Sequence, residues 1–164
     1  MINDNHTISI LVVNKPGVLM RVAQVFSRRG FNIDSLVVSS GFDNKYARMT
    51  ISAQGNEENL DQIKMQLSKL VDVMHCIEHE NIDSIIKEMA LIKVACKLQQ
   101  RSEILQLVEH FACKTVDITR ESMVIQTTGN SDKLDALIDQ LRDYTIIELV
   151  RTGKVLMARG KEET

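Results

Sequence analysis

The sequence predicts an α+β protein in which one order of elements, strand-helix-strand-strand-helix-strand, occurs twice. Three observations support this prediction. Apolar residues recur at strand or helix spacing in that order, the order of residues 1–80 returns in residues 81–164, and several residues of the two halves align at a constant spacing. The 164 residues are enough for two domains of about 80 residues each.

The first half opens with a β-rich segment at residues 7–13, followed by a turn at residues 14–17 that contains Pro16 and Gly17. Gly30, a typical helix terminator, closes a set of apolar residues at helical spacing: Val18, Leu19, Val22, Val25 and Phe26. We therefore expect a strand, a turn and an amphipathic helix.

Two further strands are expected at residues 32–40 and 46–54, joined by a loop that contains Gly41. After Gly55 a second amphipathic helix follows, with a stripe formed by Leu60, Ile63, Leu67 and Leu70. Residues 71–77 give the fourth strand. This order is the split βαβ or ferredoxin-like motif.

The second half repeats the motif. Strands are expected at residues 91–98, 115–119, 123–128 and 145–150, and helices where apolar stripes cover residues 104–111 and 134–141. Met49 aligns with Met123, 74 residues later, whereas Asp34 aligns with Asp117, 83 residues later. The strand hairpin of the first half is therefore nine residues longer. The predicted domains are residues 1–80 and 81–164.

Charge and hydropathy argue against two kinds of partner. The chain has 20 Lys and Arg against 22 Asp and Glu, a formal net charge of −2, which does not suit a nucleic-acid partner. No apolar run approaches the roughly 18–20 residues of a membrane span, and the N-terminus is polar from Asn3 to His6. We expect a cytoplasmic protein that binds neither nucleic acid nor membrane.

The cysteines do not indicate a disulfide framework or a metal site. Cys76, Cys96 and Cys113 are odd in number and lack CxxC spacing, which favours buried reduced thiols. His75, Cys76 and His79 are close in sequence, a spacing that zinc could use. Because neighbouring residues of a strand point to opposite faces, we expect no metal there.

The segment Asn14-Lys15-Pro16-Gly17 between the first strand and helix is the main candidate for a ligand site. Gly17 allows a ligand close to the backbone, and the first amide groups of the helix suit a carboxylate. Asn14 can both donate and accept hydrogen bonds, which suits an ammonium beside that carboxylate. The same residues also fit a plain helix cap and turn. The matching stretch of the second half, Lys97 to Gln100, has no glycine.

Strand topology suggests how a second copy would complete such a site. In the usual order of this motif the first two strands run parallel, so Asn32 lies about 25 Å from Asn14 within one chain. The second strand is an apolar edge, which invites pairing with another chain. Antiparallel pairing of two copies brings Asn32 of one copy beside Asn14 and Gly17 of the other, and ligand binding would then be coupled to the dimer.

We find no catalytic motif in the sequence, neither GxSxG, HExxH, a Walker loop nor a Rossmann fingerprint, and we predict no catalytic residues. Arg48 begins an otherwise apolar strand. It suits an ion pair with Asp34 or with a partner carboxylate, and it suits a solvated rim position equally well.

Two segments of the first half, VVNKPGVLMRV at residues 12–22 and RGFNIDSL at residues 29–36, resemble an ACT domain. With residues 48–51, 69–73, 90–94 and 148–153, they resemble the small regulatory subunits of acetolactate synthase, also called acetohydroxyacid synthase, over nearly the whole chain. Many ACT domains have Asp where this chain has Asn14, and Asn there is characteristic of this subunit family.

The resemblance implies a non-catalytic subunit that activates a separate large subunit. It also implies allosteric feedback inhibition by a branched-chain amino acid, usually L-valine, with leucine and isoleucine as alternatives. The large subunit of such transferases carries thiamine diphosphate, Mg²⁺ and FAD and condenses pyruvate with pyruvate or 2-oxobutanoate. None of these cofactors is expected on this chain.

The resemblance also implies where the effector binds. The family's effector residues correspond to Asn14, Gly17, Val18 and Leu19 of one subunit and to Asn32 and Ile33 of its partner. The expected partners are therefore a second copy, through the ACT domain, and the large catalytic subunit. This agrees with the strand pairing described above.

Two other classes of protein share the motif. A free-standing ACT-type amino-acid sensor would regulate another enzyme or transcription, but the sequence has no helix-turn-helix domain beyond the two repeats. A hydrolase of the acylphosphatase kind would need Arg in the loop after the first strand, where this chain has Lys15.

Overall fold

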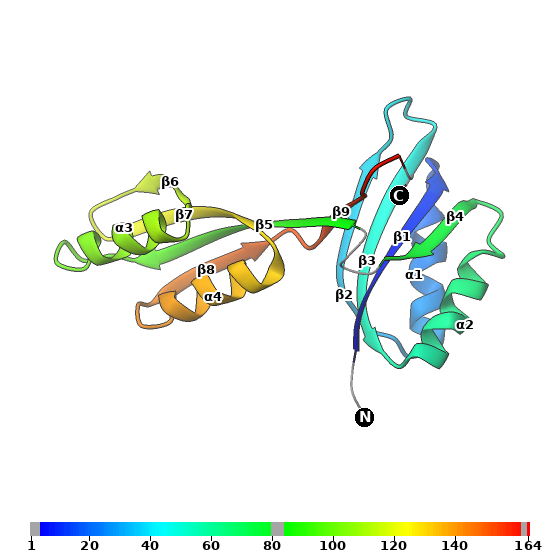
Figure 1. Ribbon diagram of the computed structural model, residues 1–164, viewed down its shortest axis with the longest axis horizontal. Helices are drawn as coiled ribbons and strands as arrows, with labels where there is room; N and C mark the ends of the chain where they lie inside the picture. The colour runs from blue at the N-terminus through cyan, green and yellow to red at the C-terminus, as the bar shows by residue number, and fades with distance from the viewer. Residues whose placement is uncertain (1–3, 80–83, 162–163) are drawn as a thin grey trace. The chain divides into compact units, whose positions relative to one another are not determined.

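The structure is a computed structural model that describes residues 4–79, 84–161 and 164 (Figure 1). The chain forms two compact units, residues 1–85 together with 153–164, and residues 86–152. Each unit contains an antiparallel sheet and two helices, which confirms the predicted α+β fold with two ferredoxin-like units. Among the described residues, no helix is long and apolar enough to cross a membrane.

The elements of the first unit are β1 (Asp4–Val13), α1 (Val18–Arg28), β2 (Ile33–Ser40), β3 (Tyr46–Gly55), α2 (Glu57–Leu67) and β4 (Val73–Glu78). The strand order is β2-β3-β1-β4, as the split βαβ motif predicts. Because β1 and β2 both pair antiparallel with β3, they run parallel to each other. α1 and α2 lie on one face of this sheet (Figure 1).

The alternation of β1 explains how the sheet buries its core. Ile8, Ile10 and Val12 point toward the helices and belong to one buried cluster with Phe26 of α1 and Ile63 of α2. Phe26, which is 1% exposed, is the largest of the fully buried side chains. The opposite face of the sheet carries four buried hydroxyl residues, Thr7, Ser9, Thr50 and Ser52.

The C-terminal residues, from Gly153 on, contribute to the burial of this polar face. They group with the first unit rather than with residues 86–152, which differs from the predicted boundary of 81–164. A Cβ atom on Gly153 would lie 2.7 Å from Cβ of Ser35 in β2, and Lys154 Nζ lies 3.4 Å from Thr7 Oγ1. The short strand β9 (Val155–Ala158), which the sequence analysis did not predict, pairs with β5 and buries Leu156.

The elements of the second unit are β5 (Ser84–Ala95), whose first two residues belong to the first unit, α3 (Arg101–His110), β6 (Lys114–Ile118), β7 (Ser122–Gly129), α4 (Ser131–Leu141) and β8 (Ile146–Arg151). The strand order β6-β7-β5-β8 repeats that of the first unit. β5 begins seven residues before the predicted start at Leu91. The core of the second unit contains Ile92, Ile104, Met123, Ile125 and Leu134.

The first helix of each unit, α1 and α3, ends in a Schellman motif. At the end of α1, Phe31 N–H donates to Phe26 O and Gly30 N–H donates to Ser27 O, with Gly30 at φ +70. At the end of α3 the same bonds are made around Ala112, which adopts φ +49 although it has a side chain. A left-handed conformation costs a non-glycine residue about 1–2 kcal/mol.

Ala112→Gly is therefore expected to stabilise the protein by about 1 kcal/mol, because the strain is removed while the unfolded chain gains some freedom. For a chain of this size that corresponds to a rise in Tm of about 2–4 °C. Thermal unfolding followed by circular dichroism measures it. The reverse change at the matching position of the first unit, Gly30→Ala, should lower Tm. A lower Tm for Ala112→Gly would contradict the backbone strain inferred at Ala112.

A chain of polar contacts joins β1, β4 and α2 in the first unit. Lys64 Nζ donates to Glu78 at 2.8 Å and to Asp61 at 2.7 Å, and His6 Nδ1 lies 2.7 Å from Glu78 Oε1. Burial by itself would raise the pKa of Glu78, but the hydrogen bonds from Lys64 and His6 outweigh burial and hold it below its usual value of 4.5. A carboxylate with a depressed pKa in the folded state stabilises the fold above its unfolded pKa.

The stabilisation from Glu78 is thus complete at neutral pH and is lost as the pH falls below about 4.5 through its folded pKa. Glu78→Gln should lower the urea midpoint at pH 7 and flatten the decline of that midpoint between pH 5 and 3, about the range in which carboxylates titrate. Glu109→Gln, an exposed change on α3, is the control. Equal acid sensitivity of wild type and Glu78→Gln would count against this role.

Candidate functional site

The loop between β1 and α1 is the candidate for an anion site, and in it Val18 N–H donates to Lys15 O at 3.4 Å. Gly17 is the N-cap of α1, at φ 85 and ψ −10, a left-handed conformation that glycine adopts without steric cost. No side chain in the described part of the chain caps this helix. Because the first amide groups of a helix have no partner inside it and lie at the positive end of its dipole, they suit a carboxylate.

Asn14 does not cap α1 but ties the loop to the hairpin between β2 and β3. Its side-chain Nδ2 donates to Asn44 O at 3.0 Å, and its backbone N–H donates to Lys45 O at 2.9 Å. Asn14 and Gly17 are both exposed, as is Leu19, whereas Val18 is buried against the core. Four of the predicted site residues therefore lie together on this end of the unit.

Arg21 lies next to this loop and was not among the predicted site residues. Its Nε and Nη2 atoms donate to Asp72 Oδ2 at 2.9 and 2.5 Å, and a Cβ atom on Gly17 would lie 3.3 Å from its Nη1. The pair could not be recognised from spacing because Arg21 and Asp72 are 51 residues apart. Its guanidinium lies beside Gly17, and the Asp72 carboxylate balances its charge there.

Asn32 and Ile33 lie at the opposite end of the same unit. In the sheet Ile33 pairs with Ala53, whereas Val13 pairs with Tyr46 at the other end of β3. Asn32 is exposed and its Nδ2 lies 3.4 Å from Asp34 Oδ1. One chain therefore does not bring the two groups of predicted residues together.

A hollow of about 390 Å³ opens beside Asn32 and Ile33. It is lined by Ala23, Phe26, Ser27, Gly30, Phe31, Asn32 and Ile33. β2 is an edge strand of the four-stranded sheet. Its Val38 is 45% exposed, so the edge offers apolar side chains as well as backbone groups to a further strand.

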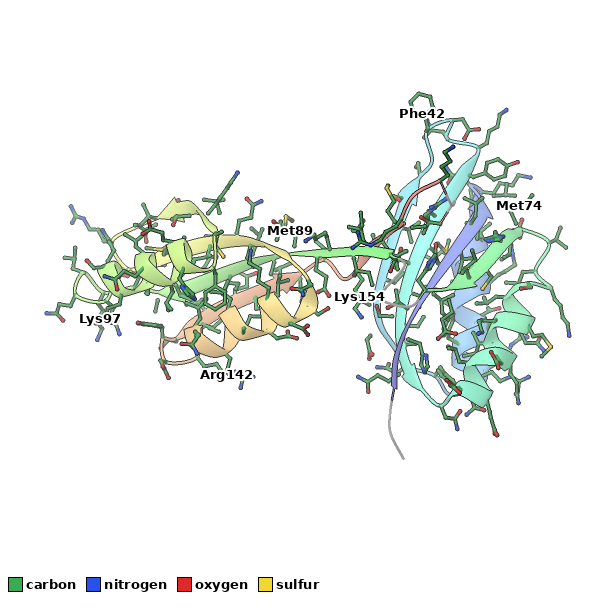
Figure 2. All side chains as sticks on the ribbon, in the orientation of Figure 1. Phe42, Met74, Met89, Lys97, Arg142 and Lys154 are labelled. Carbon is green, nitrogen blue, oxygen red and sulfur yellow. The ribbon has the colours of Figure 1, made fainter. Side chains whose placement is uncertain are left out.

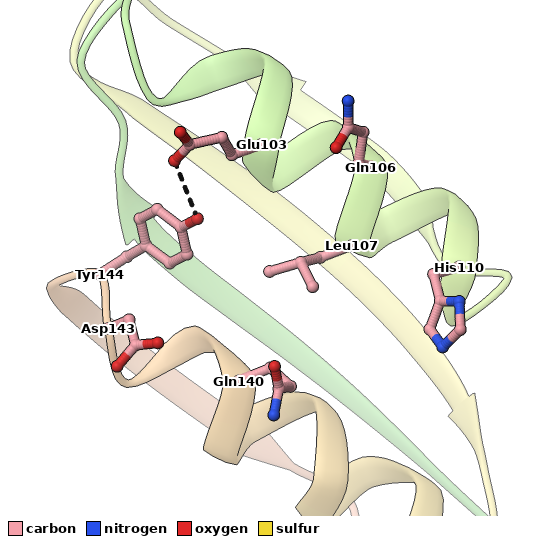
Figure 3. A pocket seen from close by; sticks show the side chains of 7 residues that line it. All are labelled: Glu103, Gln106, Leu107, His110, Gln140, Asp143 and Tyr144. Atoms are coloured by element: carbon pink, nitrogen blue, oxygen red, sulfur yellow. Dashed lines mark hydrogen bonds between the residues drawn. The ribbon is translucent and has the colours of Figure 1, made fainter.

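The second unit lacks the equivalent of the glycine loop. Gln100 is the N-cap of α3 in a right-handed conformation, and Lys97 to Gln99 are exposed. A polar hollow of about 330 Å³ lies instead between α3 and α4, lined by Glu103, Gln106, Leu107, His110, Gln140, Asp143 and Tyr144 (Figure 3). Tyr144 Oη donates to Glu103 at 3.2 Å, and burial together with that carboxylate raises the pKa of Tyr144. None of the predicted effector residues lines this hollow.

The described residues contain no group of three or more His, Cys, Asp and Glu side chains placed to hold a metal ion. Cys76 packs against the core of the first unit, while His75 is exposed. Burial raises the pKa of the Cys76 thiol to about 11. All three cysteines are free, and Cys96 is fully buried.

Arg48 and Asp34 are not brought together. Arg48 pairs across the sheet with Ser39, near the end of β2, whereas Asp34 lies near its start. Burial lowers the pKa of His79, and the charge of Arg48 lowers it further. Arg48 alternates with the core residue Met49 in β3 and therefore lies, like Thr50, on the face of the sheet away from the helices.

Comparison with known proteins gives consistent matches over both units. The protein-family model for the small subunit of acetolactate synthase matches residues 87–160. The family model for the AHAS small subunit-like ACT domain matches residues 8–75. A probable acetolactate synthase small subunit of Archaeoglobus fulgidus is 44% identical over 158 residues, covering 96% of this chain and 99% of its own.

The acetolactate synthase small subunit of Mycolicibacterium smegmatis is 44% identical over 155 residues, covering 94% of this chain and 91% of its own. Among solved structures, the acetolactate synthase small subunit from Thermotoga maritima matches with a TM-score of 0.87 and 38% identity. That match covers 97% of this chain and 99% of the other.

Proposed function

This chain belongs to the family of acetolactate synthase small subunits, and from that premise we propose that it is a non-catalytic regulatory subunit which activates a catalytic large subunit and transmits feedback inhibition by valine. In this role it acts in the biosynthesis of valine, isoleucine and leucine. The thiamine diphosphate, Mg²⁺ and FAD of the reaction belong to the large subunit in this proposal, and the small subunit holds only the effector.

The single observation that carries the effector site is the start of α1. Gly17 leaves room beside amide groups that lack helical partners, and the Arg21 guanidinium lies beside them. The second unit has the same fold without this loop, so the fold itself does not require it. A carboxylate is the charge that such a helix start stabilises.

The proposed site is completed by a second copy of the chain. Antiparallel pairing of two β2 edges sets the end of one β2 against the start of the other, so Asn14 and Gly17 of one copy meet Asn32 and Ile33 of its partner. The homodimer then contains two identical sites related by its two-fold axis. Because each site spans both copies, effector binding and dimer geometry are coupled.

Within the site each part of valine has a partner of matching chemistry. The carboxylate accepts hydrogen bonds from the amide groups around Gly17, Val18 and Leu19, and the ammonium donates to the amide oxygens of Asn14 and Asn32. The isopropyl group packs against aliphatic side chains, including Ile33. Leucine and isoleucine carry the same two charges as valine and have one methylene more. One methylene in an apolar pocket changes the binding free energy by about 1–3 kcal/mol.

Reconstitution with the large subunit tests this function directly. We expect acetolactate formation to rise when this chain is added to the catalytic subunit, and to fall again on addition of valine, with leucine and isoleucine weaker. Failure of the chain to change the rate of the catalytic subunit would contradict the regulatory role. Activation without response to any branched-chain amino acid would contradict only the effector site.

Asn14→Ala should raise the valine concentration for half-maximal inhibition about tenfold to a hundredfold. The lost hydrogen bond to a charged group is worth about 1.5–3 kcal/mol, and each 1.4 kcal/mol is a factor of about ten. The measurement is a valine titration of the reconstituted enzyme. Leu98→Ala, an exposed change in the matching loop of the second unit, is the control and should leave the titration unchanged.

A further inference from the structure

Phe42 is held in solvent at the tip of the hairpin between β2 and β3, where its relative exposure is 109% (Figure 2). The tip has its own hydrogen bonds: Gly41 N–H donates to Tyr46 O at 2.7 Å, Asn44 N–H donates to Gly41 O at 3.2 Å, and Lys45 N–H donates to Asp43 Oδ1 at 3.1 Å. This ordered turn therefore presents an aromatic ring that packs on nothing in its own unit.

The second unit shows that the fold does not need this feature. Its matching hairpin is closed by a hydrogen bond from Thr119 N–H to Ser122 O and contains only polar residues between them, Arg120 and Glu121. A fully exposed phenylalanine adds nothing to the stability of its own unit. Large aromatic side chains of this kind are the usual anchors of protein interfaces.

The hollow beside the start of β2 has room for an aromatic ring. Ala23, Phe31 and Ile33 supply apolar surface, Ser27 and Asn32 supply polar atoms, and the hollow offers about 390 Å³. A cavity of roughly 150 Å³ already accepts a benzene ring. At Gly30, on the rim, a side-chain carbon would meet no other atom within 4 Å, so the entrance is open.

Phe42 and the hollow lie at opposite ends of β2, which is eight residues long, so Phe42 cannot reach the hollow of its own chain. Antiparallel pairing of two β2 strands brings the residues after Ser40 of one copy beside the residues before Ile33 of the other. On the basis of the homodimer proposed above, we propose that Phe42 of each copy inserts into the hollow at Phe31 and Ile33 of its partner.

Charges around the two features agree with a second copy as the occupant. Asp43 follows Phe42 in the sequence, and the exposed Arg28 lies in the last turn of α1, the helix that lines the hollow. Under two-fold symmetry each of these contacts is made twice, which is a self-complementary interface.

The contact also reaches the effector site. Asn14 is bonded to the same hairpin through Asn44 O and Lys45 O, and Asn32 lines the same hollow. Docking of Phe42 thus sets the separation of Asn14 of one copy from Asn32 of the other. Phe42 is a positioning residue for effector binding.

Sedimentation equilibrium of the full chain tests the contact. Phe42→Ala should raise the dimer dissociation constant at least about tenfold, as truncation of an aromatic anchor does. Val71→Ala, which removes another exposed apolar side chain of the same unit, should leave it unchanged. An unchanged constant for Phe42→Ala would overturn the contact while leaving the homodimer intact. A wild-type chain that stays monomeric would overturn the homodimer and the contact together.

Fluorescence gives a second readout because the chain contains no tryptophan. Phe42→Trp should emit at shorter wavelength in the dimer and shift to longer wavelength on dilution to the monomer. Emission typical of exposed indole in the full dimer would overturn the proposal. So would a blue shift that appears only after the catalytic subunit is added, since the ring would then dock on that subunit.

Discussion

Gly17→Asp is expected to abolish inhibition of the reconstituted enzyme by valine while activation by the small subunit persists. The new carboxylate would occupy the start of α1, where it competes with valine for the amide groups and for Arg21. A Cβ atom at position 17 would lie 3.3 Å from Nη1 of Arg21. The new carboxylate would also repel the carboxylate of valine. Loss of two or more hydrogen bonds to a charge, each about 1.5–3 kcal/mol, predicts a loss of valine affinity of a hundredfold or more.

The control for this change is Gly160→Asp. Gly160 also has a positive φ, +74, and open space around it, so the backbone strain is matched without any contact to the site. Valine titrations of acetolactate formation and direct calorimetric titration of the small subunit should agree. Normal valine inhibition in the Gly17→Asp enzyme would show that the start of α1 is not the effector site.

Phe26→Ala is expected to have the largest effect on stability. Phe26 is 1% exposed and packs in the core between α1, α2 and the sheet of the first unit, and truncation of a buried phenylalanine costs about 3–5 kcal/mol. Because domains are stable by only about 5–15 kcal/mol, much of the first unit's stability would be lost. Urea unfolding monitored by circular dichroism measures the change.

Met65→Ala is the matched control, because Met65 is 59% exposed on α2 and surface changes usually stay within about 0.5 kcal/mol. Chemical shifts of the second unit should stay native-like in Phe26→Ala, since that unit has a core of its own. Equal urea midpoints for Phe26→Ala and Met65→Ala would contradict the packing described for the first unit.

Much of the fold could be predicted because apolar periodicity reports local structure directly. The stripe from Val18 to Phe26 predicted α1, and the β-rich composition of residues 7–13 predicted most of β1. The strand order followed from the motif, and with it the separation of Asn14 from Asn32. The comparisons confirm the family to which these patterns were assigned.

The features that escaped prediction depend on contacts between distant residues. The grouping of residues 153–164 with the first unit was not predicted, and among their described residues the one regular element is the four-residue strand β9. The Arg21–Asp72 pair joins residues far apart in sequence. Asn14 fitted a helix cap equally well from sequence, and only the structure shows that it bonds the hairpin at Asn44.

A mixed dimer tests the central claim, that each valine site is shared by two copies. Gly17→Asp and Asn32→Ala homodimers, purified separately, should each bind valine weakly because both of their sites carry a defect. A heterodimer, co-expressed with two different affinity tags, carries both defects in one site and leaves the other site intact.

Calorimetric titration of that heterodimer with valine is the decisive measurement. A shared site predicts that one site per heterodimer regains wild-type affinity. If each site lay within a single chain, every site in the heterodimer would carry one defect, and no wild-type affinity would return. Absence of any restored binding would therefore contradict the shared site.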